Sequence, residues 1–139
     1  MSRDIIGDRI LILDFGSQYT QLIARRVREL GVYCEIYSYK STITSIKKFN
    51  PKGAILSGGP ETVKQKSSPK VQSKLFDLNI PILGICYGMQ SIAQQMGGKV
   101  KLANKREFGQ AKLKVLNKAS GLLKGITKTS INVWMSHGD

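Results

Sequence analysis

Short apolar runs alternate with longer, more polar stretches through the first hundred residues of the chain. We predict strands at Arg9–Phe15, Val32–Tyr37, Gly53–Ser57 and Ile80–Ile85, each of which is a brief, largely apolar run. We predict helices at Gln18–Leu30, Ile43–Phe49, Val71–Leu78 and Met89–Met96; the first and last have apolar residues at helical spacing. This strict alternation predicts an α/β fold, an open, mostly parallel sheet with helices on both faces.

The pattern changes in the last forty or so residues. Apolar and polar residues alternate in Lys99–Leu102 and Gln110–Leu116, and Ile131–Met135 is another apolar run. These segments predict added antiparallel strands near the C-terminal end. We treat residues 1–139 as one domain. Because a predicted strand lies only a few residues before Asp139, we expect this domain to continue beyond that residue.

The charge of the chain is strongly basic. It has 22 Lys and Arg against 9 Asp and Glu, a formal net charge of +13. Nucleic-acid binding is one interpretation, but the lysines are scattered, and aromatic residues are not interleaved with them as a base-stacking surface requires. We expect a solvated basic surface and no nucleic-acid partner. The apolar runs are too short to span a bilayer, and the N-terminus has no apolar leader, so we expect a cytoplasmic protein without a membrane partner.

Cysteine and histidine are scarce. The chain has two cysteines, Cys34 and Cys86, and one histidine, His137. They do not have the spacing of metal ligands, so no metal site is predicted. Cys34 lies in the middle of a predicted strand with no activating neighbour, and we interpret it as a structural residue.

The strongest local signal is Gly84-Ile85-Cys86-Tyr87-Gly88. It follows a predicted buried strand and opens a predicted helix, which is the pattern of a nucleophile elbow with Cys in place of Ser. The sharp turn crowds the neighbours of the nucleophile, so glycine is needed on both sides of it. The turn would present Cys86 at the carboxyl edge of the sheet, where open α/β sheets bind ligands. We therefore predict that Cys86 is a nucleophile.

A second signal, Ser57-Gly58-Gly59-Pro60, lies at the carboxyl end of another predicted strand. In a parallel sheet it falls on the same edge as Cys86, and its glycines allow the backbone to approach a ligand closely. A backbone N–H group of this loop and that of Tyr87 could form an oxyanion hole. The segment Asp14–Ser17 also reaches this edge, although an ordinary strand-to-helix turn would have the same pattern.

Taken together, the motifs resemble the class I glutamine amidotransferases, whose fold is flavodoxin-like. The blocks that carry the general resemblance are Gly84–Gln90 and Leu56–Glu61. Three further blocks are similar to the amidotransferase domain of glutamine-hydrolysing GMP synthases: Ile10–Gln21, Arg106–Gly109 and Val133–Asp139.

The resemblance implies a reaction and the residues that perform it. Cys86 would attack the amide carbon of glutamine, form a thioester and release ammonia, while Gly59 and Tyr87 supply the oxyanion-hole N–H groups. The residues implied in binding glutamine are Gly58, Gln90, Ser136, Gly138 and Asp139.

The resemblance also implies a partner for this domain. Ammonia would pass to a synthetase domain of the ATP pyrophosphatase type, on the same chain or on a separate subunit, which aminates XMP to GMP. ATP and Mg²⁺ are expected in that absent domain and no cofactor in this one. A homodimer is expected through parts outside this sequence.

One departure from the family pattern concerns the catalytic base. The family's base is a histidine in a His-Pro-Glu block, and this sequence has no such block. His137 lies in Ser-His-Gly-Asp, which matches a substrate-side motif, so we do not assign it to the triad. General acid–base catalysis typically contributes about 10²–10⁴-fold, and we expect the 139-residue chain alone to hydrolyse glutamine very poorly. The alternatives are a glutaminase of the anthranilate synthase type and a non-catalytic domain of the same fold.

Overall fold

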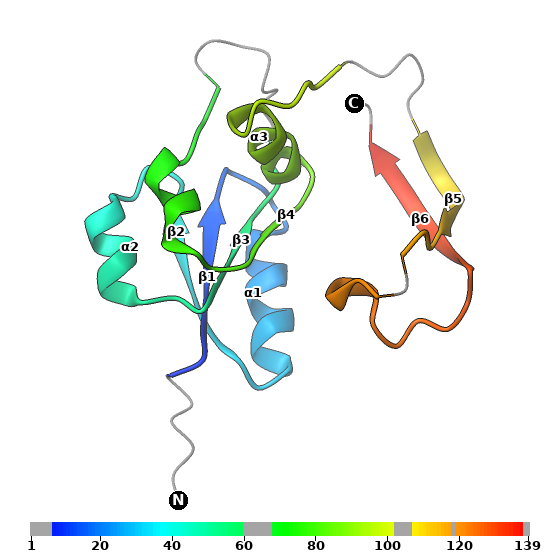
Figure 1. Ribbon diagram of the computed structural model, residues 1–139, viewed down its shortest axis with the longest axis horizontal. Helices are drawn as coiled ribbons and strands as arrows, with labels where there is room; N and C mark the ends of the chain where they lie inside the picture. The colour runs from blue at the N-terminus through cyan, green and yellow to red at the C-terminus, as the bar shows by residue number, and fades with distance from the viewer. Residues whose placement is uncertain (1–6, 60–67, 102–106, 118, 138–139) are drawn as a thin grey trace, which may run out of the picture. The chain divides into compact units, whose positions relative to one another are not determined.

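Four short strands pair in parallel to form the central sheet of the chain (Figure 1). They are β1 (Arg9–Asp14), β2 (Tyr33–Ser38), β3 (Gly53–Leu56) and β4 (Ile82–Gly84), in the spatial order β2-β1-β3-β4. The computed structural model describes residues 7–59, 68–101, 107–117 and 119–137. It divides into two units, residues 1–100 and 101–139, and the sheet lies in the first. The predicted parallel α/β architecture is confirmed.

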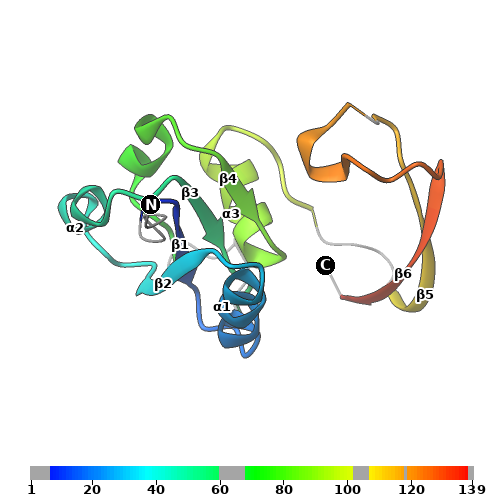
Figure 2. The same cartoon turned by 90° about the horizontal axis from the view of Figure 1, so that it is seen from below.

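The core lies on both faces of the sheet because the side chains of a strand alternate between faces. Leu11 and Leu13 of β1 are fully buried on one face, against α2 (Ile43–Phe49), the 3₁₀ helix η1 (Ser73–Leu78) and α3 (Tyr87–Gln95). Ile12 is fully buried on the other face, against α1 (Thr20–Glu29). Figure 2 shows α1 on the opposite side of the sheet from α2. Cys34 of β2 packs beside Ile12, as expected of a structural cysteine.

The strand order creates a switch point between β1 and β3. The chain leaves β1 toward β2 on one side, whereas β3 pairs with β1 on the other side and with β4 beyond it. Loops that leave neighbouring strands in opposite directions open a crevice at the carboxyl edge of the sheet, and open α/β folds bind their ligands there. The fold therefore directs attention to the segments that follow β1, β3 and β4.

Local signals explain where several elements begin and end. The Thr42 hydroxyl accepts a hydrogen bond from the backbone N–H of Ser45 at 3.2 Å and so caps the start of α2. Asn50 ends α2 in the left-handed conformation with φ 54°, which Asn tolerates better than most residues. The observed elements agree with the predicted ranges to within about two residues for most helices and strands, which is the usual uncertainty of helix ends.

Two sequence predictions are wrong in the described residues. The segment predicted as the helix Val71–Leu78 is a 3₁₀ helix over Ser73–Leu78, ended by Asn79 in the left-handed conformation. The residue before it is Gln72, whose side chain accepts from the backbone N–H group of Ile43 at 3.2 Å and not from the first turn of this helix, so the start of a regular helix lacks a capping contact. The described part of the predicted strand Lys99–Leu102, residues 99–101, forms no strand.

The second unit is built on an antiparallel hairpin. Strand β5 (Glu107–Lys114) pairs with β6 (Ser130–His137), from Glu107 opposite His137 to Lys114 opposite Ser130. A short 3₁₀ helix, η2 (Gly121–Leu123), lies in the connection. The prediction of antiparallel strands in this region is confirmed, although β5 starts three residues before the predicted Gln110.

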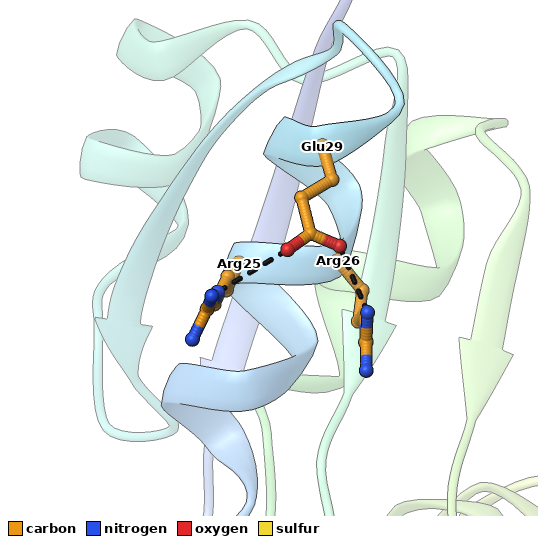
Figure 3. Close-up of polar contacts among 3 residues, drawn as sticks. All are labelled: Arg25, Arg26 and Glu29. Carbon is orange, nitrogen blue, oxygen red and sulfur yellow. Dashed lines mark hydrogen bonds and ion pairs between the residues drawn. The ribbon is translucent and has the colours of Figure 1, made fainter.

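Charged side chains on α1 show how part of the basic surface is arranged. Figure 3 shows Glu29 between two arginines, with Arg25 Nε 3.2 Å and Arg26 Nη1 2.9 Å from its carboxylate oxygens. All three side chains are largely exposed to solvent. This face of α1 is therefore a solvated helix surface, and its exposed ion pairs contribute little to stability.

Candidate functional site: a cysteine elbow at the edge of the sheet

The backbone at Cys86 has an unusual conformation. Its φ is 52° and its ψ is −115°, close to the values of about +60° and −120° that define the first central residue of a type II′ turn. The turn is closed by a hydrogen bond from the Gly88 N–H group to the Ile85 carbonyl oxygen at 3.0 Å. A side chain other than glycine is strained there, and such strain costs about 1–3 kcal/mol. Strained residues cluster at functional sites, and this one is an exposed cysteine.

The two glycines of the elbow are required by close backbone contacts. A Cβ atom at Gly84 would lie 2.6 Å from Met89 Cα, and one at Gly88 would lie 2.2 Å from the Leu56 carbonyl oxygen. Real Cβ atoms are essentially never found this close to other atoms, so a side chain at either position would force the backbone to shift. The absence of side chains therefore lets α3 begin directly against β3 and β4, as the pattern Gly-x-Cys-x-Gly predicted.

A cavity of about 350 Å³ opens in front of Cys86. Among the described residues its lining comprises Gly16, Ser17, Gln18, Tyr19, Gly58, Gly59 and Cys86. These residues come from the segments that follow β1, β3 and β4, so the cavity lies at the switch point of the sheet. The loop after β3 is very close to the cysteine, because a Cβ atom at Gly58 would be 3.4 Å from Cys86 Cβ.

Hydrogen bonds from one carboxylate shape the wall formed after β1. Asp14 Oδ1 accepts from the Gly16 N–H group at 2.8 Å and from the Thr20 hydroxyl at 2.9 Å. The Ser17 hydroxyl accepts from the Tyr19 N–H group at 3.0 Å. These short-range contacts fold the segment into successive turns that lead from β1 into α1. The side chains of Asp14, Ser17 and Thr20 therefore hold this wall in place through their hydrogen bonds.

The residues predicted for the site do not all reach the cavity. Cys86, Gly58 and Gly59 line it, as the sequence suggested, whereas Tyr87 and Gln90 are not among the described residues that do. The Tyr87 ring is buried against Phe15, with ring centres 5.2 Å apart, and its hydroxyl donates to the Pro69 carbonyl oxygen. The side chain of Tyr87 therefore has a structural function, and only its backbone remains a candidate oxyanion donor.

Other predicted positions lie where their side chains are not described. The backbone of Ser136 pairs with Phe108 in the hairpin, but its side chain is outside the described part of the chain. Gly138 and Asp139 lie wholly outside the described residues. The predicted contribution of these three residues to glutamine binding stays a prediction.

Four residues of the cavity were not predicted as site residues. Gly16, Ser17, Gln18 and Tyr19 follow β1 and form a large part of the lining. The sequence placed Asp14–Ser17 on this edge but gave no means of separating a binding wall from an ordinary strand-to-helix turn. The missing information is the pairing of β1 with β3, which brings this segment opposite Gly58 and Gly59.

The described residues lack the features of a metal centre and of a membrane-spanning helix. They contain no group of three or more His, Cys, Asp or Glu side chains placed to hold a metal ion. None of the helices that the structure describes is both long and apolar enough to cross a membrane.

Comparison with known proteins identifies the family. The sequence profile described as Glutamine amidotransferase class-I matches residues 11–139, nearly the whole chain. The chain belongs to the class I glutamine amidotransferase family. The cysteine elbow and the glycine loop opposite it lie within the matched residues of this amidotransferase.

Several relatives of this amidotransferase carry the same name. Proteins called GMP synthase [glutamine-hydrolyzing] from Hahella chejuensis and Pseudomonas putida are each 56% identical to it, and one from Vibrio parahaemolyticus is 55% identical. Each alignment covers the whole chain but only 26–28% of the relative, so the chain spans about a quarter of the length of these proteins.

A solved structure is also similar to this amidotransferase. The crystal structure of a protein from Thermoplasma acidophilum, provisionally assigned as one subunit of a GMP synthase, superposes with a TM-score of 0.79 at 34% sequence identity. The superposition covers 94% of this chain and 65% of that one. This likeness confirms the class I amidotransferase fold that the sequence motifs predicted.

Proposed function

We propose that this chain is the glutamine-hydrolysing part of a GMP synthase and that Cys86 is its nucleophile. The observation that carries the proposal is the strained elbow, which presents the exposed cysteine beside Gly58 and Gly59 in one cavity. A conformation that costs free energy at a cysteine in a cavity is expected where the sulfur must be positioned for attack. The names of the relatives support the assignment to GMP synthesis.

The proposed reaction begins with attack of the Cys86 sulfur on the amide carbon of glutamine. A C–S bond forms, the carbonyl π electrons move to the oxygen, and backbone N–H groups of Gly59 and Tyr87 stabilise the resulting oxyanion. The C–N bond then breaks, and the nitrogen takes up a proton to leave as ammonia. Water hydrolyses the thioester to glutamate and restores the thiol.

Glutamine is expected to lie in the cavity between the loop after β3 and the wall after β1. The cavity volume of about 350 Å³ exceeds that of a single amino-acid side chain, and the glycines of its lining allow a ligand to approach the backbone closely. Gly58, Gln90, Ser136, Gly138 and Asp139 are the remaining residues that we propose for substrate binding.

We further propose that the ammonia serves a synthetase part, on the same chain or on another subunit, which converts XMP to GMP with ATP and Mg²⁺. The described residues do not offer a cluster of acidic or other ligands for the metal ion, so no step of the glutaminase reaction is assigned to it. A cytoplasmic location and a homodimer are further expectations of this proposal.

Covalent labelling tests the nucleophile. A diazoketone analogue of glutamine is incubated with the 139-residue chain, and the modified peptide is identified by mass spectrometry. We expect slow labelling confined to Cys86 and suppressed by excess glutamine. The Cys86→Ala variant should not be labelled, while Cys34→Ala, the matched control at a buried cysteine, should react like the wild type. Labelling that glutamine does not suppress would contradict the proposal.

A chimera tests the link to GMP. The part of the Hahella relative that aligns with this chain, 28% of its length, is replaced by this chain, and formation of GMP from XMP is measured with glutamine or with ammonium as the nitrogen source. We expect both activities in the chimera, and only the ammonium-dependent activity after Cys86→Ala. A chimera active with ammonium but not with glutamine would refute the assignment.

A further inference from the structure

Ser57 is a buried polar residue directly before the glycine loop of the site, and the proposed reaction does not use it. It is fully buried, with 0% of its surface exposed, between the strand end of β3 and the cavity. Its backbone N–H donates to the Leu13 carbonyl oxygen at 3.0 Å, and its own carbonyl oxygen accepts from the Gly88 N–H group at 3.1 Å. Ser57 is thereby joined to β1 on one side and to the cysteine elbow on the other.

The hydroxyl of Ser57 makes two more hydrogen bonds. Its oxygen accepts from the Phe15 N–H group at 3.2 Å, at the start of the cavity wall. Its proton is donated to the Gly58 carbonyl oxygen at 3.0 Å. One buried hydroxyl therefore links the segment after β1 to the glycine loop after β3, and buried polar groups so paired fix local geometry strongly.

The second of these bonds determines the direction of an N–H group. The Gly58 carbonyl and the Gly59 N–H belong to the same planar peptide unit, and the described residues contain no cis peptide bond. In a trans peptide the C=O and N–H vectors point in opposite directions. Because Ser57 holds the Gly58 oxygen, the Gly59 N–H group points away from the buried Ser57 hydroxyl, and both glycines line the cavity.

An anchor is needed because two glycines in succession restrict the backbone very little. Glycine populates both signs of φ, so a Gly-Gly peptide unit can rotate as a whole with a small change in free energy. After such a rotation the carbonyl oxygen would face the cavity, and an oxygen there would repel a developing oxyanion. A buried donor to the Gly58 oxygen favours the orientation that keeps the Gly59 N–H group available.

We propose that Ser57 is a positioning residue for the oxyanion hole: its buried hydroxyl holds the Gly58–Gly59 peptide so that the Gly59 N–H group faces Cys86. The proposal rests on the function proposed above, because it presumes that an oxyanion forms next to this peptide. Ser57 does not itself touch the substrate. It acts through the orientation of the peptide unit that follows it.

The test compares a probe that needs the oxyanion hole with one that does not. The first is L-2-amino-4-cyanobutanoic acid, the nitrile that corresponds to glutamine. The Cys86 thiol adds to its nitrile carbon, so that a C–S bond forms, one C–N π bond breaks and the nitrogen takes the thiol proton. Negative charge develops where the oxyanion would be. The second probe is iodoacetamide, which alkylates the sulfur by direct displacement of iodide.

Three variants of the full 139-residue chain are compared with the wild type. Ser57→Ala removes the hydroxyl, and Ser57→Thr keeps it. Ser91→Ala is the matched control, since the Ser91 hydroxyl is also buried but donates to Gln95 at 3.1 Å, within α3. Nitrile affinity is measured from the equilibrium fraction of adduct by intact mass, and far-UV circular dichroism reports the fold.

We expect Ser57→Ala to weaken nitrile binding at least tenfold, because loss of one oxyanion donor typically costs about 10²–10³-fold in rate and a misdirected donor costs part of that. Its rate of alkylation at Cys86 should stay within about threefold of the wild type, as for any variant that retains the fold and the exposure of the sulfur. Ser57→Thr and Ser91→Ala should bind the nitrile within about threefold of the wild type, since both retain the anchor.

Two results would overturn the inference while leaving the proposed function intact. One is a Ser57→Ala variant that binds the nitrile as the wild type does. The other is a parallel loss of nitrile binding and alkylation with an altered dichroism spectrum, which would mean that the hydroxyl supports the fold in general. Failure of the wild type itself to form any adduct at Cys86 would instead overturn the proposed function, and the role of Ser57 with it.

Discussion

Replacement of Gly88 by alanine should destabilise the chain strongly, although alanine normally favours helices. The added Cβ would lie 2.2 Å from the Leu56 carbonyl oxygen and 2.8 Å from Leu56 Cβ, where ordinary contacts begin at 3.4 Å. Leu56 is fully buried in β3, so it cannot move aside without disturbing the sheet. Either α3 or β3 must shift by about an ångström, and overpacking of this kind costs about 1–3 kcal/mol.

Two smaller contributions act in opposite directions. A shift of the turn would weaken the hydrogen bond from the Gly88 N–H group to Ser57, now 3.1 Å long, which is worth about 0.5–1.5 kcal/mol. Alanine in place of glycine within a helix stabilises the folded state by roughly 0.5–1 kcal/mol, because the unfolded chain then has less conformational entropy to lose. These two nearly cancel, so we expect a net loss of about 1–3 kcal/mol, set by the steric contact.

Urea denaturation measures this loss. Ellipticity at 222 nm is the appropriate signal because the α-helices of the described residues all lie in the first unit, which contains Gly88. The control is Gln94→Ala, an exposed position of the same helix and the same unit; it should change the free energy of unfolding by less than about 0.5 kcal/mol. A Gly88→Ala variant that unfolds within about 1 kcal/mol of the wild type would refute the reasoning.

Three further predictions follow from other contacts. The hydrogen bond to Glu35 and desolvation raise the pKa of Tyr33, so the protonated phenol stabilises the fold below about pH 10 and this stabilisation is lost as the pH rises further. The free energy of unfolding, measured by urea titration at each pH, should therefore fall above about pH 10. The fall should be smaller in Tyr33→Phe. Asp14→Ala should cost about 1–2 kcal/mol in urea denaturation, because it removes the acceptor that Thr20 uses at the start of α1. Glu29→Ala should change the melting temperature very little, because its ion pairs are exposed and worth about 0.5 kcal/mol.

The sequence was sufficient to predict the sheet and the elbow because both depend on local patterns. A strand such as Arg9–Asp14 is recognisable from its apolar run, and parallel pairing follows from the alternation with helices. The elbow is recognisable because close packing admits only glycine at Gly84 and Gly88, as the short separations at both positions demonstrate. In these places the local sequence and the tertiary structure demand the same residue.

Where the prediction failed, the deciding information was not local. Ser17 and Tyr19 line the cavity because β1 lies next to β3, and nothing in the segment itself distinguishes it from an ordinary turn. Val71 to Leu78 has the composition of a helix, yet only a 3₁₀ helix forms in Ser73–Leu78. Its place is set partly by distant contacts, such as the hydrogen bond from Gln95 to the Val71 carbonyl oxygen across 24 positions.

The position of Cys86 is held mainly by the main chain. The Gly88 N–H group reaches both the Ile85 and Ser57 carbonyl oxygens, at 3.0 and 3.1 Å, and the Ile85 N–H group reaches that of Leu56 at 2.9 Å. These bonds tie the elbow to the end of β3 with no side chain between them, because Gly84 and Gly88 allow the contact. Ser57 is the one residue among these four that also forms hydrogen bonds through its side chain. A network made of backbone groups tolerates substitutions at the surface but not at its glycines. A mutation that removes the Ser57 hydroxyl is therefore the one that should change the orientation of the glycine loop.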